Sequence, residues 1–239
     1  MTPSPARVLR RLLFGAVATG LAVAPAAAAT RPIVVELFTS QGCSSCPPAD
    51  AFLGELVRER DDLLPLAFHV TYWNRLGWAD PFSFDEATRR QAAYGTRFGD
   101  GSYTPEMVVD GRWSLVGSDR ASAAQAFARA ASRQGEGPEV SAEARDGRVS
   151  IRVGRGDAVG RVLLVGWDRE HRTPVGRGEN RGRVLVEANV VRSFTPLGTW
   201  TGAPARLEAD LPAGEQWAVL VEAPEGGILG AARVRSATP

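Results

Sequence analysis

The chain has 239 residues, of which 44% are apolar and 23% are charged, with a formal net charge of +1. This composition is typical of a soluble protein with a sizeable core, and the length fits one large domain or two small ones. Every basic residue is arginine, because the sequence contains no lysine. The absence of lysine excludes mechanisms that depend on a P-loop lysine, a Schiff-base lysine or a serine–lysine dyad.

Residues 1–29 have the layout of a secretory signal peptide. Arg7, Arg10 and Arg11 precede an apolar run over residues 12–23, and an alanine-rich stretch ends near Ala29. The alternative is a retained membrane anchor, but glycines and a proline interrupt the segment, so it would span a bilayer poorly. We therefore expect a periplasmic or secreted protein with no membrane span once the signal is removed, exported by the Sec or the twin-arginine route.

Removal of the signal also changes the charge. It deletes three of the 28 basic residues and none of the 27 acidic ones, which leaves 25 basic residues and a net charge of −2. A slightly acidic chain has no basic surface to attract phosphates, so nucleic acid is not expected as a partner.

The chain has two cysteines, Cys43 and Cys46, in a C-x-x-C motif. In an oxidising compartment such a pair can cycle between thiols and a disulfide or stay oxidised. A purely structural disulfide is the alternative, but closing so short a loop removes little chain entropy. The spacing therefore favours a redox or a metal-binding role.

The motif is expected where a buried strand meets a helix. Residues 33–38 form an apolar strand interrupted by Glu36, whose carboxylate is either buried with a partner or at an edge facing water. With Ser44 or Ser45 as N-cap, two prolines fall in the first helical turn, where they cost little. Cys43 then lies at the positive end of the helix dipole, which favours its thiolate, so we expect Cys43 to be the nucleophile and Cys46 the resolving thiol.

The following residues predict further alternation of strand and helix. A strand over residues 63–72 leads into a loop that contains Trp73 and Trp78, which either line a groove for a substrate peptide or cover the end of the sheet. A capping box over residues 83–86 starts a helix that Gly99 ends. Thr104 and Pro105 then precede a hairpin, and a last helix capped by Ser118 or Asp119 runs to about residue 133.

The segment 134–138 is the expected domain boundary, because the hydrophobic period changes to two beyond it. We expect an α/β domain over residues 30–135 and a β-sandwich-like domain over residues 138–239. A polar, arginine-rich loop at residues 177–181 is either functional or, as is usual for such loops, simply solvated.

The order of elements around the C-x-x-C motif resembles the thioredoxin fold. The resemblance implies that Pro105 is a cis-proline beside the disulfide, where the backbone at Thr104 and Pro105 binds substrate. It also implies that Glu36 matches the buried acid that moves protons in thioredoxin, with a slip of one residue. The chain departs from thioredoxin in having no tryptophan before the motif and in having Ser44-Ser45 between the cysteines.

A closer resemblance is to a secreted bacterial thioredoxin-like family, domain-of-unknown-function family 1223. It is carried by the block VELFTSQGCSSCPPAD at residues 35–50, by Phe68-His69-Val70, Leu76-Gly77-Trp78 and Thr104-Pro105, and by residues 182–192. The likeness covers nearly all of the chain beyond residue 29. It implies a fold, an envelope location and redox activity, and it brings no substrate.

The leading hypothesis is a thiol–disulfide oxidoreductase that needs no cofactor beyond the Cys43–Cys46 disulfide. Its partners would be a protein or small thiol or disulfide substrate and an unknown redox partner. Two alternatives remain: an envelope copper-binding protein or chaperone with Cys43, Cys46 and His69 as ligands, and a non-catalytic envelope binding module. The sequence leaves open the direction of exchange, the reduction potential, the oligomeric state and the role of the C-terminal part.

Overall fold

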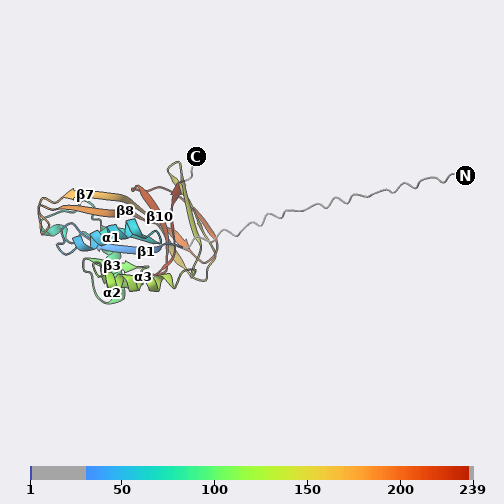
Figure 1. Cartoon of the computed structure of the whole chain (residues 1–239), viewed down its shortest axis with the longest axis horizontal. Coiled ribbons are helices and arrows are strands. Elements are labelled where there is room, and N and C mark those ends of the chain that lie inside the picture. Colours follow the sequence, from blue (N-terminus) through green and yellow to red (C-terminus); the bar gives the residue numbers. More distant parts are fainter. Residues whose placement is uncertain (2–30, 237–239) are drawn as a thin grey trace.

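The computed structural model describes Met1 and residues 31–236, and it shows a mixed α/β fold with two sheets (Figure 1). The predicted signal peptide at residues 1–29 lies outside these described residues, apart from Met1. Among the described residues, no helix combines the length and the apolar character needed to cross a membrane.

The first part of the chain alternates strands and helices in the predicted order. Its elements are β1 (Ile33–Thr39), α1 (Pro47–Glu59), β2 (Leu63–His69), the 3-10 helix η1 (Asn74–Leu76), α2 (Asp85–Phe98), β3 (Glu106–Val109), β4 (Trp113–Val116) and α3 (Arg120–Ala131). Strands β1 and β2 are parallel, whereas β3 runs antiparallel to both β1 and β4. A helix connects the parallel pair, as such a crossover requires.

The remaining elements are all strands. They are β5 (Val140–Arg145), β6 (Arg148–Val153), β7 (Gly160–Pro174), β8 (Val184–Trp200), β9 (Ala205–Asp210), β10 (Gln216–Glu222), β11 (Ile228–Arg233) and β12 (Arg235–Ser236). One sheet has the order β11-β10-β7-β8-β2-β1-β3-β4, and a smaller sheet has the order β12-β5-β6-β9.

The large sheet crosses the predicted domain boundary, so the expectation of a separate sandwich requires correction. Strand β8 adds in parallel to β2, with Ala67 opposite Val190, and thereby joins the two parts in one sheet. The smaller sheet packs against the far end of the large one through a shared apolar core that includes Ile151, Leu164 and Val219. The alternating pattern predicts strands with one buried face, but it does not specify which sheet each strand joins.

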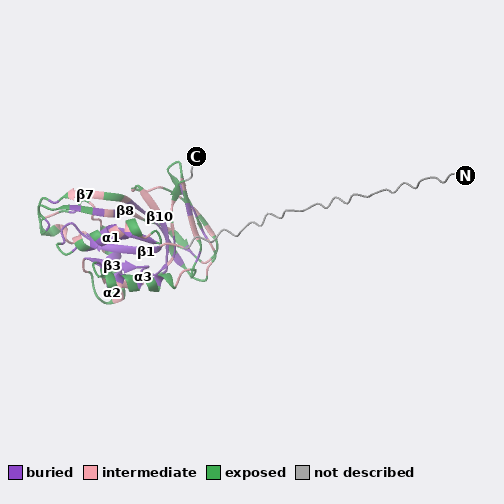
Figure 2. Cartoon of the chain, viewed as in Figure 1, coloured by how far each residue is buried: buried purple, intermediate pink, exposed green. Residues whose placement is uncertain are grey.

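Helices cover both faces of the α/β part. Helices α1 and α3 pack on one face of β1 through a core that includes Val35, Leu37 and Leu53, and α2 packs on the other face. Figure 1 shows β7, β8 and β1 running in the same lengthwise direction, and in the sheet β2 lies between β8 and β1. Strands β1 and β3 are buried throughout (Figure 2), as expected for strands covered on both sides.

The helix ends agree with the sequence analysis in part. Gly99 is left-handed at the C-cap of α2 and the Asp119 carboxylate caps α3, as predicted. The N-cap of α1 is Cys46, and neither Ser44 nor Ser45 takes that place, although both prolines lie in the first turn as expected. The predicted capping box of α2 is wrong, because Phe84 is the N-cap and no side chain caps this helix.

Of the two alternatives for Glu36, a buried position with a partner is correct, because Glu36 belongs to a buried ion-pair network. Glu36 is fully buried, and Arg90 of α2 donates to both of its carboxylate oxygens. Arg90 also donates to Glu222 of β10 at 2.7 Å, and the Tyr94 hydroxyl donates to Glu36 at 2.6 Å. The network therefore links α2 to the central strand β1 and to the C-terminal strand β10.

Replacing Arg90 with alanine should lower the free energy of unfolding by about 3–5 kcal/mol, because it leaves the buried Glu36 without its cation and leaves Glu222 with the exposed Arg161 alone. Arg89 offers a matched control, since it is an exposed arginine that pairs with Glu86 on the same helix. Urea denaturation of both variants measures the difference. Equal effects of Arg90→Ala and Arg89→Ala would contradict the stabilising role of the network.

Candidate disulfide site

Cys43 and Cys46 form a disulfide at the junction between β1 and α1. Their sulfurs are 2.13 Å apart and their Cα atoms 5.5 Å apart. Cys46 is the N-cap of α1, and its carbonyl accepts hydrogen bonds from the backbone of Ala49 and Asp50. The pair thus lies at the positive end of the helix dipole, as predicted.

The motif holds few hydrogen-bond donors for the Cys43 sulfur. Pro47 and Pro48 lack backbone N–H groups, which removes two donors from the first helical turn, while the N–H groups of Ala49 and Asp50 are used by the Cys46 carbonyl. The Ser45 hydroxyl lies 3.4 Å from the Cys43 sulfur and can donate to it. Both cysteines are 0% exposed in the oxidised protein, although Ser44 and Ser45 between them are exposed.

The predicted substrate-binding residues Thr104 and Pro105 lie beside the motif. The peptide bond between them is cis, and the Ser45 hydroxyl donates to the Thr104 carbonyl at 3.4 Å. Gly117 packs behind Pro105, where an added Cβ would lie 2.6 Å from Leu37 Cδ1 and 3.2 Å from Pro105 Cβ. Glycine is therefore required at position 117 for this close packing.

Trp73 and Trp78 are half-buried and use their ring N–H groups near the motif. Trp73 donates to the Thr104 hydroxyl at 2.8 Å, and Trp78 donates to the Gln41 side chain at 3.0 Å. These bonds connect the aromatic loop to the two segments that flank the disulfide. The rings border the site, and both alternatives for this loop, a substrate groove and coverage of the end of the sheet, remain open.

A buried acid lies one helical turn beyond Cys46. Asp50 of α1 accepts a hydrogen bond from the Thr39 hydroxyl at 2.7 Å, at the end of β1. Burial raises the pKa of Asp50 to about 7, although the Thr39 bond acts in the opposite direction. A carboxyl with this pKa can accept or release a proton near neutral pH.

Three further titratable side chains, His69, Asp80 and Glu187, are buried near Asp50. His69 Nδ1 donates to Asp80 at 2.7 Å, while His69 Nε2 faces a Glu187 oxygen at 3.8 Å. Burial works against protonation of His69, but the Asp80 carboxylate outweighs it, and the pKa of His69 is raised to about 9. The cluster therefore carries an imidazolium between two acids and contributes to the charge around Asp50.

The structure separates Glu36 from this cluster. Glu36 points to the α2 face of β1 with its partner Arg90, whereas α1 and Asp50 lie on the opposite face. Asp50 is thus the buried acid on the helix that carries the disulfide, and the sequence analysis missed it. The available signal was its position four residues after Cys46, within a buried stripe of α1.

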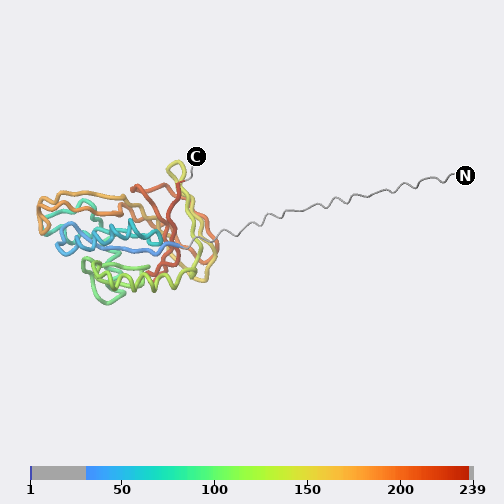
Figure 3. Tube along the Cα trace, in the orientation of Figure 1, coloured from blue at the N-terminus to red at the C-terminus, as the bar shows by residue number. Residues whose placement is uncertain are grey.

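The C-terminal part also reaches the motif. The Glu179 carboxylate accepts a hydrogen bond from the Ser44 backbone N–H at 3.1 Å. The Asn180 side chain donates to the carbonyls of Gln41 at 3.0 Å and Cys43 at 2.9 Å. Figure 3 shows the turn between β7 and β8, in orange, at the same end of the molecule as the blue segment that follows β1. Of the two alternatives for the loop at residues 177–181, the contacts of Glu179 and Asn180 favour a functional one, whereas Glu187 was not anticipated.

The three ligands of the copper alternative, Cys43, Cys46 and His69, have other partners in this structure. Both ring nitrogens of His69 face carboxylates, and both cysteine sulfurs are used in the disulfide. Over residues 31–236, no group of three or more histidine, cysteine or acidic side chains is arranged to hold a metal ion.

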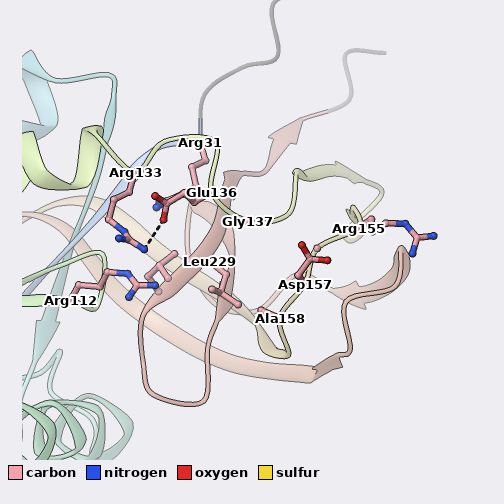
Figure 4. A pocket seen from close by; sticks show the side chains of 12 residues that line it. Arg31, Arg112, Arg133, Glu136, Gly137, Arg155, Asp157, Ala158 and Leu229 are labelled. Carbon is pink, nitrogen blue, oxygen red and sulfur yellow. Dashed lines mark ion pairs between the residues drawn. The ribbon is translucent and has the colours of Figure 1, made fainter.

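Two pockets lie away from the disulfide. One is near the start of β1, where Arg133 and Glu136 point toward each other as an ion pair and Arg155 points away (Figure 4). The other lies between α2 and the C-terminal strands, and its lining includes Arg90 and Phe194. Neither contains a motif residue.

Asp50 makes stability depend on pH. Burial raises the pKa of Asp50 from its ordinary value of 3.8 to about 7, so between these pH values the folded state holds a proton that the unfolded state has released. The stability that the folded state gains from binding this proton is fully present below pH 3.8 and is lost as the pH rises through 7. The free energy of unfolding of Asp50→Asn minus that of the wild type should therefore increase by about 4 kcal/mol as the pH rises from 4 to 8. Denaturant titration of the oxidised proteins measures this gain, and a difference that stays constant with pH would contradict the raised pKa.

Comparisons with known proteins place the chain in a family. Residues 34–222 match the family described as protein of unknown function, DUF1223. A crystal structure of a protein from Agrobacterium tumefaciens is 33% identical, covers 85% of this chain and 93% of its own, and has a TM-score of 0.72. HBP35 of Porphyromonas gingivalis is similar in fold alone, with 13% identity, coverage of 88% and 80% respectively, and a TM-score of 0.62. No curated protein matches the chain. The chain therefore belongs to the DUF1223 family.

Proposed function

We propose that this protein is a thioredoxin-like thiol–disulfide oxidoreductase of the periplasm or the secreted fraction. The observation that carries the proposal is the Cys43–Cys46 disulfide at the N-terminus of α1, beside Thr104 and one helical turn from the buried acid Asp50. A structural disulfide has no need of a neighbouring acid whose pKa is raised to about 7.

The proposed chemistry is an exchange of one disulfide for another. The reduced protein uses the Cys43 thiolate to attack one sulfur of a substrate disulfide, which forms a mixed disulfide and releases the other substrate sulfur as a thiolate. Deprotonated Cys46 then attacks the Cys43 sulfur, which restores the Cys43–Cys46 disulfide and releases the second substrate thiolate. The substrate gains two electrons and the protein loses two. The reverse sequence oxidises a dithiol substrate.

Asp50 is proposed to handle the proton of Cys46. Its backbone N–H binds the Cys46 carbonyl at 3.1 Å, so its side chain belongs to the first turns of the same helix. With a pKa of about 7, it can accept the thiol proton when Cys46 attacks and return the proton in the reverse step. Glu36 has no such role in this proposal, because its ion pair with Arg90 lies on the opposite face of β1.

The flanking residues would position the substrate. Ser45 lies near enough to Cys43 to donate a hydrogen bond to its thiolate, which would favour attack. In the proposal, the backbone at Thr104 and Pro105 binds a substrate segment, and Trp73 and Trp78 border it. The substrate class is a protein or small thiol or disulfide, with a separate redox partner that restores the pair.

The activity can be tested with the mature chain, residues 30–239. It should catalyse the reduction of insulin by a dithiol, or the oxidation of a dithiol peptide, and Cys43→Ser should abolish turnover because it removes the attacking sulfur. Ser44→Ala is a matched control, because it changes an exposed motif residue and keeps both sulfurs. Turnover of the wild type no higher than that of Cys43→Ser, in both assays, would exclude the proposed activity.

The role of Asp50 predicts a specific pH profile. The rate of attack by Cys46 on a mixed disulfide at Cys43 should rise with an inflection near pH 7, as Asp50 becomes able to accept the proton. Asp50→Asn should slow this step by about 10²-fold and remove the inflection. Rapid-mixing measurements of product release give the rate. A variant that retains the wild-type inflection would show that another group moves the proton.

A second candidate function is a non-catalytic binding module. The observation in its favour is that both cysteines are 0% exposed. On this alternative the oxidised pair would not react with substrates, and the aromatic loop would dock a partner. The insulin and dithiol assays separate the two functions directly.

A further inference from the structure

The loop between β7 and β8 is bonded to the backbone of the disulfide motif. We call residues 175–183 the lid. Two glycines of the lid, Gly176 and Gly178, lie against Trp78. A Cβ added at Gly176 would be 3.5 Å from the Trp78 ring, and one added at Gly178 would be 3.2 Å from the Trp78 Cβ. The lid thus packs on the aromatic loop and bonds to the motif, while the cysteines beneath are closed to solvent.

Asn180 anchors the lid. It is 0% exposed, and its amide group donates to two backbone carbonyls of the motif segment, at Gln41 and Cys43. Its side-chain oxygen in turn accepts a hydrogen bond from Arg183 at 3.1 Å, which fixes the direction of the amide. None of these bonds requires a particular charge on the Cys43 sulfur, so Asn180 supplies a constant attraction.

Glu179 adds an attraction that depends on charge. Its exposed carboxylate binds the Ser44 N–H at the N-terminal end of α1, and this hydrogen bond lowers the pKa of Glu179. Helix N-termini favour one negative charge in this position. Because Pro47 and Pro48 offer no N–H groups, few donors remain for a second anion there.

We propose that the lid is linked to the redox state of the disulfide. Glu179 and Asn180 hold it on the motif while Cys43 and Cys46 are oxidised, and the negative charge that reduction leaves on Cys43 repels Glu179 and releases it. The lid therefore opens in the reduced form, which is the form that attacks a substrate disulfide. This inference rests on the proposed exchange function and assigns a regulatory role to the C-terminal half of the chain.

The charge arises from a balanced reaction. One thiolate of a dithiol reductant attacks the Cys43 sulfur, the bond to Cys46 breaks, and Cys46 takes up a proton. The second thiolate then attacks the reductant sulfur of this mixed disulfide, so the reductant leaves as its own disulfide and Cys43 remains as a thiolate. Two electrons pass to the protein, and one of the two reductant protons goes to solvent.

The same repulsion fixes the sign of two measurable quantities. A docked Glu179 disfavours the Cys43 thiolate, so it raises the pKa of Cys43 and stabilises the disulfide against reduction. The other charged groups around the motif are Asp50 of α1, His69 of β2, Asp80 of the aromatic loop and Glu187 of β8. The lid itself carries the exposed Arg177, Arg181 and Arg183, of which Arg183 donates to Asn180. These remain in place when Glu179 alone is changed, so the difference isolates its charge.

Hydrogen exchange of the wild-type protein tests lid opening without any substitution. Backbone amides of residues 175–183 should exchange about threefold faster in the reduced protein than in the oxidised protein at pH 8, after correction for intrinsic rates, because the thiolate and the docked Glu179 disfavour each other by the same factor. Amides of β6, far from the motif in the smaller sheet, should be unchanged. Equal exchange of the lid in the two redox states would overturn the proposal.

Glu179→Gln tests the electrostatic part. It should lower the pKa of Cys43 by about half a unit, and shift the equilibrium with glutathione toward the dithiol by about threefold. Glu225→Gln is the matched control, because it removes the same charge from another exposed turn and should change neither quantity. Thiolate absorbance gives the pKa. An unchanged Cys43 pKa in Glu179→Gln would refute the role of its charge.

Asn180→Ala tests the anchor. In the oxidised protein it should bring lid exchange close to that of the reduced wild type, while the pKa of Cys43 shifts in the same direction as in Glu179→Gln because the lid no longer holds Glu179 in place. Unchanged lid exchange in this variant would contradict the anchoring role. The two proposals can fail separately. If the lid opens on reduction but turnover is no higher than that of Cys43→Ser, the lid inference stands and the proposed oxidoreductase function is excluded.

Discussion

The ion pair between His69 and Asp80, buried beneath the disulfide, organises the surroundings of the site. Asp80 also accepts the Gln41 N–H at 2.8 Å, just before the motif, and so joins the aromatic loop to the end of β1. Glu187 of β8 faces the other nitrogen of His69 and accepts the Gln41 side-chain N–H at 2.7 Å. Because unpaired buried charges are costly, these groups hold four segments in one arrangement.

This cluster gives the C-terminal half a physical reason to be part of the same fold. Strand β8 brings Glu187 into the buried cluster, and the turn before it brings Glu179 and Asn180 over the motif. At the other end, Glu222 of β10 completes the buried pairing of Arg90. The site is therefore assembled from distant parts of the chain, and the family match over residues 34–222 spans all of these residues.

Most features that depend on neighbouring residues could be predicted, apart from the N-caps of α1 and α2, whereas features that depend on tertiary pairing could not. The disulfide partners, the prolines in the first turn of α1 and the caps at Gly99 and Asp119 follow from local spacing. The merging of two predicted domains into one sheet does not, because strand periodicity carries no information about the partner strand. Asp50 was hidden for a related reason: an acid in an apolar helical stripe reveals its importance only when its burial is known.

The reduction potential of the Cys43–Cys46 pair tests the central claim most directly. A disulfide that cycles in exchange should reach a reversible equilibrium with glutathione or a dithiol buffer, at a potential between about −120 and −270 mV, the range of known exchange proteins. A pair that stays oxidised to below about −300 mV would behave as a structural disulfide, and it would contradict the account of this site as a redox centre.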